Sequence, residues 1–301
     1  MLDKATWTRS VEVLSDTAEI VLPGTVYNTA LEVEGKIRRG DAVLIRAGYG
    51  KMMTTEFVGY VQEIRTDGGS ITILCEDGLF LYRTDVPDKE LNNVTLTAIV
   101  AYLHQTVKSM TVSCDYELTY DKFTIHGATA YDVLKQLQGD TKANIYLKDN
   151  VLHMHPQYSE IFGTADYDFA HNIDKQGTEL KYRDATDRKL LVTVDAKDKK
   201  GKTIRIEEGT TGGDKLSLSI SGVSDEASLR KIAQETLAQK VYSGYEGAIR
   251  GWLVPACDAG YSVGIHDADY VSKNGRYYAL EVKSEIGSTG GIRTIKLGKR
   301  I

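Results

Sequence analysis

The sequence has few prolines and cysteines, little excess charge and no long apolar run, and each shortage excludes a class of protein. Cys75, Cys114 and Cys257 lie far apart without a CxxC pair, which argues against a disulfide framework or a zinc finger. We expect all three to be small apolar residues in strands. The 37 basic and 42 acidic residues leave a net charge of −5, which is unfavourable for a general nucleic-acid binder. Because apolar runs are short and the first 20 residues are charged throughout, we expect no membrane insertion and no signal peptide.

Glycine and tyrosine are abundant instead, with 28 and 18 copies, and with many Val, Ile and Thr they are typical of a strand-rich chain with tight turns. Alternating apolar residues predict N-terminal strands at 11–14, 18–22, 42–46, 57–64 and 71–74. A middle α+β part is predicted to hold helices 95–107 and 129–138 with strands 110–114, 123–126, 144–148 and 151–155. The C-terminal part is predicted to hold a meander of strands 178–183, 189–196 and 202–206, a helix at 225–242, and strands 246–254, 261–266, 276–286 and 292–297.

Local signals mark several boundaries. Thr95 and Ser224 are the expected N-caps of the first and third helices, and Gly139 lies near the expected end of the second. Asp149-Asn150 predicts a hairpin turn. The charged turn Asp198-Lys199-Lys200-Gly201 is expected to be a solvated hairpin tip.

Two strand-rich segments resemble one another, which indicates an internal repeat. Gly40-Asp41-Ala42-Val43-Leu44-Ile45 aligns with Gly260-Tyr261-Ser262-Val263-Gly264-Ile265 at an offset of 220. Phe57-Val58-Gly59-Tyr60-Val61 aligns with Tyr277-Tyr278-Ala279-Leu280-Glu281 at the same offset, and Gly68-Gly69 with Gly290-Gly291 at 222. The alternative is that antiparallel barrels look alike by pattern alone.

The fold class predicted from these patterns is mainly β with an α+β insert, with two similar small antiparallel β-barrels flanking an α+β domain. The predicted domains are a first tube-forming barrel at 1–86, the insert at 87–165, and at 166–301 a β-rich region with one helix that ends in a second tube-forming barrel.

The sequence offers no positive case for an enzyme. Gly48-Tyr49-Gly50-Lys51 and the segment Gly209–Lys215 do not fit a phosphate-binding loop, and we interpret both as turns. The carboxylate pairs Asp166 with Asp168 and Asp267 with Asp269 could do acid–base work but lie in charged, solvated loops. We therefore predict no catalytic residues, no cofactor site and no cofactor.

His153-Met154-His155 places two imidazoles on one face of a strand, where a nearby carboxylate could complete a metal site. No third ligand stands at a telling spacing, so we expect the pair at the exposed end of a hairpin and predict no metal site.

The order of parts resembles the tail hub family of contractile phages, the late-control protein D group, which is related to the base of type VI secretion spikes. Three stretches carry the resemblance: the opening from Val11-Glu12-Val13 to Asp16-Thr17-Ala18-Glu19-Ile20-Val21-Leu22-Pro23, Gly40-Asp41-Ala42-Val43-Leu44-Ile45 with Phe57-Val58-Gly59-Tyr60-Val61, and Tyr277-Tyr278-Ala279-Leu280-Glu281-Val282 with Gly290-Gly291-Ile292-Arg293-Thr294.

The resemblance implies a structural protein of the virion tail baseplate, present in the host cytoplasm during assembly. Such hubs are homotrimers in which two barrels per subunit form a ring of six, joining a sixfold tail tube to a threefold spike. The implied partners are the tube, the spike and other baseplate proteins, and DNA passes the lumen without specific binding. The alternatives are a carbohydrate- or cell-wall-binding module that uses the tyrosines (Tyr242, Tyr245, Tyr261, Tyr270, Tyr277 and Tyr278), and, ranked last, a cell-wall hydrolase.

Overall fold

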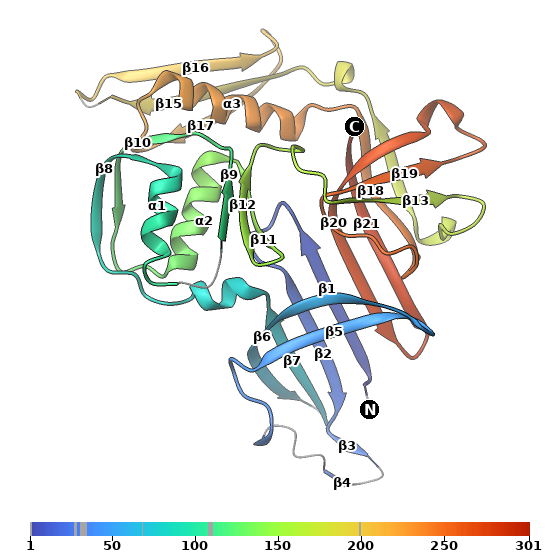
Figure 1. Ribbon diagram of the computed structural model, residues 1–301. Coiled ribbons are helices and arrows are strands. Elements are labelled where there is room, and N and C mark those ends of the chain that lie inside the picture. Colours follow the sequence, from blue (N-terminus) through green and yellow to red (C-terminus); the bar gives the residue numbers. More distant parts are fainter. Residues whose placement is uncertain (1, 27–28, 31–34, 68, 108–110, 199) are drawn as a thin grey trace. The chain divides into compact units, whose positions relative to one another are not determined.

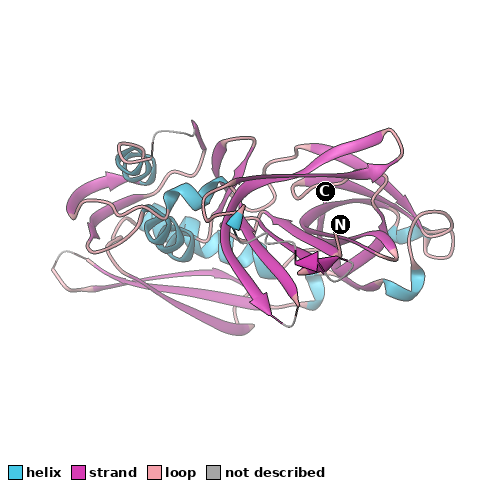
Figure 2. Cartoon of the chain, turned by 90° about the horizontal axis from the view of Figure 1, so that it is seen from below, coloured by secondary structure: helices cyan, strands magenta, loops and turns pink. Residues whose placement is uncertain are grey.

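The computed structural model describes residues 2–26, 29–30, 35–67, 69–107, 111–198 and 200–301 (Figure 1). Strands dominate over helices throughout this part of the chain (Figure 2). The predicted fold class, mainly β with an α+β insert, is therefore confirmed. Within the described ranges, none of the helices has both the length and the apolar character that a membrane crossing requires.

The chain divides into two compact units, and each is built from separated segments. Unit 1 comprises Met1–Phe80, Ile161–Tyr182 and Gly244–Ile301, and unit 2 comprises Leu81–Glu160 and Arg183–Ser243. The division into domains at residues 86 and 165 stays a prediction.

Unit 1 contains two sets of five strands with the same order. The first set is β1 (Lys4–Ser10), β2 (Thr17–Pro23), β5 (Ala42–Tyr49), β6 (Met52–Asp67) and β7 (Ser70–Glu76). The second is β14 (Glu179–Arg183), β18 (Gly244–Trp252), β19 (Tyr261–His266), β20 (Gly275–Gly287) and β21 (Gly290–Arg300). The first set has the spatial order β1-β2-β7-β6-β5 and the second β14-β18-β21-β20-β19, so each strand has a counterpart at the same place.

One continuous sheet joins the two sets, because β1 pairs with β20 in antiparallel fashion. The remaining strand of this sheet, β13 (Gly163–Asp168), pairs in parallel with β19. The short strands β3 (Thr25–Val26) and β4 (Thr29–Ala30) form a separate pair. Each set has its own apolar core, one around Trp7 and Phe57 and the other around Tyr277 and Val282. The repeat seen in the sequence is therefore a repeat of topology as well.

Hydrogen bonds correct the alignment of the long strands. Gly40 N–H donates to the carbonyl of Val61 at 2.8 Å, and its counterpart Gly260 donates to the carbonyl of Ala279, also at 2.8 Å. A bulge follows at the same place in each copy, after Val61 in β6 and after Ala279 in β20. Gly40 and Gly260 keep the predicted offset of 220, but Val61 of β6 corresponds to Ala279 of β20, an offset of 218. The predicted alignment of Phe57 with Tyr277 is therefore wrong by two residues. Gly68 of the expected Gly68-Gly69 turn lies outside the described residues.

The predicted strand at 11–14 is wrong, and the strand that precedes it, β1, was missed. Residues 11–15 form bends rather than a strand. Val11 and Leu14 are buried whereas Val13 is half exposed, and the Glu12 amide donates to the Ser10 hydroxyl at 3.1 Å. The apolar residues thus anchor a turn, and their spacing resembles strand alternation only by chance.

In unit 2, the expected meander is also wrong. Its first strand, β14, belongs to the sheet of unit 1. The others form a three-stranded sheet in which β15 (Leu190–Lys197) pairs antiparallel with β16 (Thr203–Gly209) and parallel with β17 (Asp214–Ile220). β15 is buried at nearly every position, which suits a middle strand rather than an edge of a meander.

The helices of unit 2 follow their caps. α1 (Leu96–Leu103) has the predicted N-cap Thr95, whose hydroxyl accepts from the Ala98 amide at 3.2 Å, but α1 ends before the predicted Val107. α2 (Ala130–Thr141) continues past Gly139 and ends at Lys142, which is left-handed. α3 (Glu226–Lys240) is capped by Asp225 and not by Ser224, because the Asp225 carboxylate accepts from the Ser228 amide at 2.8 Å.

The remaining strands of unit 2 carry the candidate histidines. β11 (Asn144–Lys148), β12 (Val151–His155) and β9 (Thr111–Cys114) form a sheet with β12 in the middle, and β8 (Lys89–Thr95) pairs with β10 (Thr119–Ile125). Asp149 and Asn150 both have positive φ, which confirms the predicted hairpin turn. Met110, the predicted first residue of β9, lies outside the described residues.

Candidate functional site

The seam between the two strand sets of unit 1 is held by a buried charge network. The Glu56 carboxylate from β6 accepts from Arg293 Nη2 of β21 at 2.6 Å, and the two side chains are 2% and 0% exposed. Glu56 also accepts from Trp7 Nε1 at 3.1 Å and from the Thr54 hydroxyl at 2.7 Å. Arg9 lies 3.4 Å from the same carboxylate.

Arg293 is fixed from its other side by backbone carbonyls. Its Nη1 donates to Leu253 at 2.7 Å and to Pro255 at 3.0 Å, and its Nε donates to the Ser284 hydroxyl at 3.2 Å. A planar guanidinium that donates to two carbonyls, a hydroxyl and a carboxylate is held in one orientation. The network therefore fixes how the second strand set meets the first.

Two further carboxyl groups lie beside the first set, Asp16 just before β2 and the buried Asp77 just after β7. Asp77 accepts from the Ser15 hydroxyl at 2.8 Å and from the Leu79 and Asp16 amides, each at 2.9 Å. Burial is the largest influence on both carboxyls, raising the pKa of Asp77 to about 7 and the pKa of Asp16 well above its usual range. These groups are used to close a turn within unit 1.

The residues considered for chemistry in the sequence serve structural contacts. Asp166 pairs with Arg276 at 2.9 Å, Asp168 with His266 at 2.7 Å, and Asp267 accepts from the Asp269 amide at 2.9 Å. The glycine loops are turns, one between β5 and β6 and the other between β16 and β17. The charged turn joins β15 to β16, with the Lys200 and Lys202 amides donating to Asp198 at 2.8 Å each, and Lys199 lies outside the described residues.

The cysteines are mostly as expected. Cys75 lies buried in β7 and Cys114 lies in β9, but Cys257 is in a loop, which corrects the prediction that it is in a strand. Burial raises the pKa of the Cys75 thiol to about 11 and that of Cys257 to about 12. Neither thiol is therefore activated as a nucleophile.

The tyrosines named for a glycan-binding groove do not form one surface. Tyr277 and Tyr278 are 0% and 1% exposed, and Tyr245 is 5% exposed. The rings of Tyr245 and Tyr277 lie 4.7 Å apart in the core of the second strand set. These aromatic side chains pack in the core of the second strand set, which removes the main support for a carbohydrate-binding surface.

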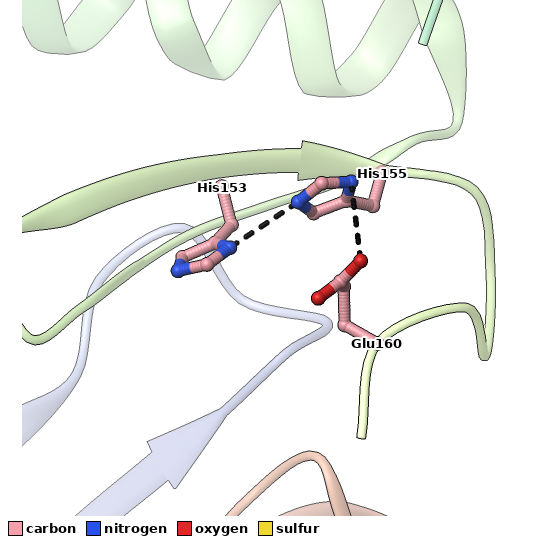
Figure 3. Close-up of side chains that lie close together, drawn as sticks. All are labelled: His153, His155 and Glu160. Carbon is pink, nitrogen blue, oxygen red and sulfur yellow. Dashed lines mark hydrogen bonds and ion pairs between the residues drawn. The ribbon is translucent and has the colours of Figure 1, made fainter. Parts of the chain in front are cut away.

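The histidine pair on β12 is buried, contrary to the expected exposed position. His153 is 9% and His155 is 3% exposed, because β12 is the middle strand of its sheet. His153 Nδ1 lies 3.2 Å from His155 Nε2, and Glu160 Oε1 lies 3.8 Å from His155 Nδ1. Figure 3 shows the three side chains pointing toward one another.

Two residues that sequence reasoning missed complete this cluster. His155 Nδ1 lies 2.6 Å from the Asp115 carboxylate, and the Ser113 hydroxyl lies 3.3 Å from His155 Nε2. The Tyr146 ring stacks on His153 at 5.2 Å between centroids. Burial lowers the pKa of His153. Ser113 comes from β9 and Asp115 directly follows it, so only the parallel pairing of β9 with β12 brings them to the histidines.

No protein-family model and no curated protein sequence matches this chain. Solved structures that are similar to this chain include the following three. The 43 kDa tail protein of prophage MuSo2 from Shewanella oneidensis has a TM-score of 0.67 at 17% identity, over 99% of this chain and 94% of that protein. A tail protein from Neisseria meningitidis also has a TM-score of 0.67, at 14% identity, over 98% and 91% of the two chains.

The third structure is a component of the type VI secretion system from E. coli that exhibits structural similarity to T4 bacteriophage tail proteins gp27 and gp5. Its TM-score is 0.62 at 8% identity, over 100% of this chain and 73% of that one. Likeness at such low identity is a likeness of fold. The chain therefore has the fold of phage tail and baseplate hub-like proteins, as the resemblance found in its sequence implied.

Proposed function

We propose that this protein is a structural, non-enzymatic hub subunit of a contractile phage tail baseplate or a related injection machine. In this role three copies form a pseudo-sixfold ring that joins the tail tube to the spike. The observation that carries the proposal is the doubled five-strand topology within one sheet, together with the fold it shares with tail proteins.

The strand pairing that joins the two sets within one chain can be repeated between two chains. Within the chain, β1 of the first set pairs with residues 281–286 of β20 in the second set. The Val11 amide and the Ser10 hydroxyl add bonds to the Leu280 carbonyl at 3.1 and 3.3 Å. Lys4 and Glu285 form an ion pair across the same join at 2.7 Å.

The internal join uses one edge of β1 and one edge of β20. In the described part of the chain, no strand pairs with the corresponding edges of the other copy of the repeat. The counterpart of β1 is β14, which ends the sheet order. The counterpart of residues 281–285 is 63–67 of β6, beyond the last residue that β5 pairs with, Tyr60. The Gln62 carbonyl, which is the counterpart of the Leu280 carbonyl, accepts from the Arg39 side chain at 3.2 Å.

Repetition of the internal join would pair β14 of one copy with β6 of the next. Such a contact is head-to-tail, so it forms a ring if the rotation closes and a filament if it does not. Two strand sets per chain give six sets in a closed trimer, which matches a sixfold tube with a threefold spike. Unpaired strand edges also promote aggregation, so pairing them in an assembly gives both edges a function.

The rest of the proposal follows from this role. The partners are further copies of the chain, the tube protein, the spike and other baseplate proteins, and DNA passes the lumen without specific binding. The site of action is the virion tail baseplate, with assembly in the host cytoplasm. Residues 1–86 and the end of 166–301 carry the tube-forming barrels, and 87–165 is the insert.

Cysteine cross-linking tests the proposed join. Lys181→Cys on β14 is combined in turn with Glu63→Cys, Arg65→Cys and Asp67→Cys on β6, which samples the neighbouring registers. The matched control is Thr8→Cys with Lys283→Cys, which are partners across the internal join and should close within one chain. The unmodified chain controls for its own three cysteines.

We expect oxidation of the concentrated protein to give covalent dimers and trimers for one of the Lys181 combinations, and nothing larger. Only monomers in all three combinations, with the control pair closed, would exclude the β14–β6 join. A ladder that continues beyond the trimer would exclude a closed ring of three.

A further inference from the structure

The buried histidine cluster of unit 2 has the donors of a metal site that the proposed function does not use. His153 and His155 project from the same face of β12, whose neighbours β11 and β9 hold it on both edges. Donors on a middle strand are held more firmly than donors on a loop. The spacing of the two imidazoles is thus fixed by the sheet before any ion arrives.

The Asp115 carboxylate selects the tautomer of His155. Because it lies 2.6 Å from Nδ1, this nitrogen carries the proton and donates it, which leaves the lone pair on Nε2. A carboxylate behind a histidine in this way is the usual arrangement around metal-bound imidazoles. His155 Nε2 then faces His153 Nδ1 within hydrogen-bond distance.

The distance between the two facing nitrogens suits a tetrahedral ion. Zinc–nitrogen bonds of about 2.0–2.1 Å at the tetrahedral angle place two ligand nitrogens about 3.3–3.4 Å apart. The observed separation is 3.2 Å. An ion bound by both nitrogens would take the place of the hydrogen bond between them, and the proton of that bond would pass to solvent.

Glu160 can supply a third donor from the loop after β12. Its Oε1 lies 3.8 Å from His155 Nδ1, so the side chain would turn toward Nε2 to reach the ion. One donor atom each from His153, His155 and Glu160 lies within 4.8 Å of the others. The loop before Glu160 is held by the Gln157 amide, which donates to Glu235 at 2.8 Å, and by the Gln157 side chain, which donates to the Lys142 carbonyl at 2.9 Å. The Glu160 side chain is 37% exposed, so an ion can enter on its side.

We propose that His153, His155 and Glu160 bind one zinc ion, with Asp115 positioning His155 and water at the fourth place. Two imidazoles and one carboxylate suit zinc, whereas magnesium and calcium prefer oxygen donors alone. The ion would link the loop that contains Glu160 to β12 and so stabilise this part of unit 2. This inference does not depend on the hub proposal, since it concerns the isolated chain.

The test is metal binding by the full-length protein after treatment with a chelator. Titration with Zn²⁺ followed by calorimetry should give one ion per chain. His153→Ala should lower the affinity at least about tenfold, as should Asp115→Asn through its loss of the carboxylate behind His155. His266→Ala is the matched control, since His266 is an exposed histidine that also pairs with an aspartate, at 2.7 Å, and it should leave binding unchanged.

Co²⁺ added to the wild-type chain gives a second readout that needs no variant to fold. We expect the visible absorption of a four-coordinate ion without the intense band of thiolate ligation. Absence of that absorption and of stoichiometric Zn²⁺ binding would overturn the proposal. Binding that survives His153→Ala but is lost in His266→Ala would also overturn it.

Discussion

Replacing Glu56 by Gln is the sharpest test of how the two strand sets are joined. The substitution keeps the size of the side chain but removes its charge, and it puts an N–H donor where one carboxylate oxygen now accepts. If that donor takes the place of Oε2, it faces the Trp7 N–H, which donates to this oxygen at 3.1 Å. If it takes the place of Oε1, it faces Arg293.

The expected loss follows from what Arg293 can do after the change. Its other donors remain on the carbonyls of Leu253 and Pro255, so the guanidinium stays in place and 0% exposed, with no anion beside it. Leaving one partner of a buried pair without the other costs about 3–5 kcal/mol of unfolding free energy. Glu285→Gln, at the exposed pair with Lys4, is the matched control and should change the unfolding free energy little.

Urea unfolding followed by tryptophan fluorescence measures both variants. Trp7 is 1% exposed and contacts Glu56, whereas Trp252 is 56% exposed, so the change in signal on unfolding reports mainly on Trp7. A Glu56→Gln variant as stable as Glu285→Gln would refute the idea that this network fixes the join. The double variant Glu56→Gln with Arg293→Met should recover part of the loss, because the uncompensated charge is then removed.

Three further outcomes are expected. Since burial raises the pKa of Asp77 to about 7, the folded state binds more protons than the unfolded state between the ordinary carboxyl pKa and about 7. Stability should therefore fall as pH rises through this window, and Asp77→Asn should flatten that dependence in thermal unfolding at a series of pH values. Thr129→Ala removes the hydroxyl that accepts from the Asp132 amide but keeps the Thr129 amide that donates to the Asp132 carboxylate, and it should cost about 1 kcal/mol in urea unfolding, with helix content retained. Gly59→Ala should cost about 1–3 kcal/mol because its Cβ would lie 2.2 Å from the Glu76 carbonyl, whereas Gly139→Ala, in open space within α2, should gain about 0.5–1 kcal/mol; equal effects of the two would contradict this reasoning.

Strand positions were largely predictable because alternation is a local property. β11 and β12 have the predicted bounds, since the Asp149-Asn150 turn fixes where one ends and the other begins. β1 was missed although its signal was present, as Ala5 and Trp7 alternate with Thr6 and Thr8. The bounds of these strands thus follow from a few neighbouring residues.

Pairing was less predictable because it depends on residues far apart in the chain. Nothing near 178–183 shows that this strand joins β18, some 60 residues later, rather than β15. The histidine cluster has the same limit. The spacing of His153 and His155 is visible in the sequence, but their burial and the approach of Asp115 depend on β9 pairing with β12. The topology and the candidate site therefore both depend on pairing between strands that are far apart in the sequence.

The shared sheet of unit 1 also imposes an order in time. All strands of the first set are synthesised within the first 80 residues, yet the free edge of β1 must wait for β20, because Ala5 pairs with Ile286. At a synthesis rate of about 5–20 residues per second, the interval lasts on the order of 10–40 seconds. During that interval β1 is an open edge of the first strand set, able to capture β20 of another chain. Translation of several copies from one message would then favour exchange of the second strand set between neighbouring nascent chains.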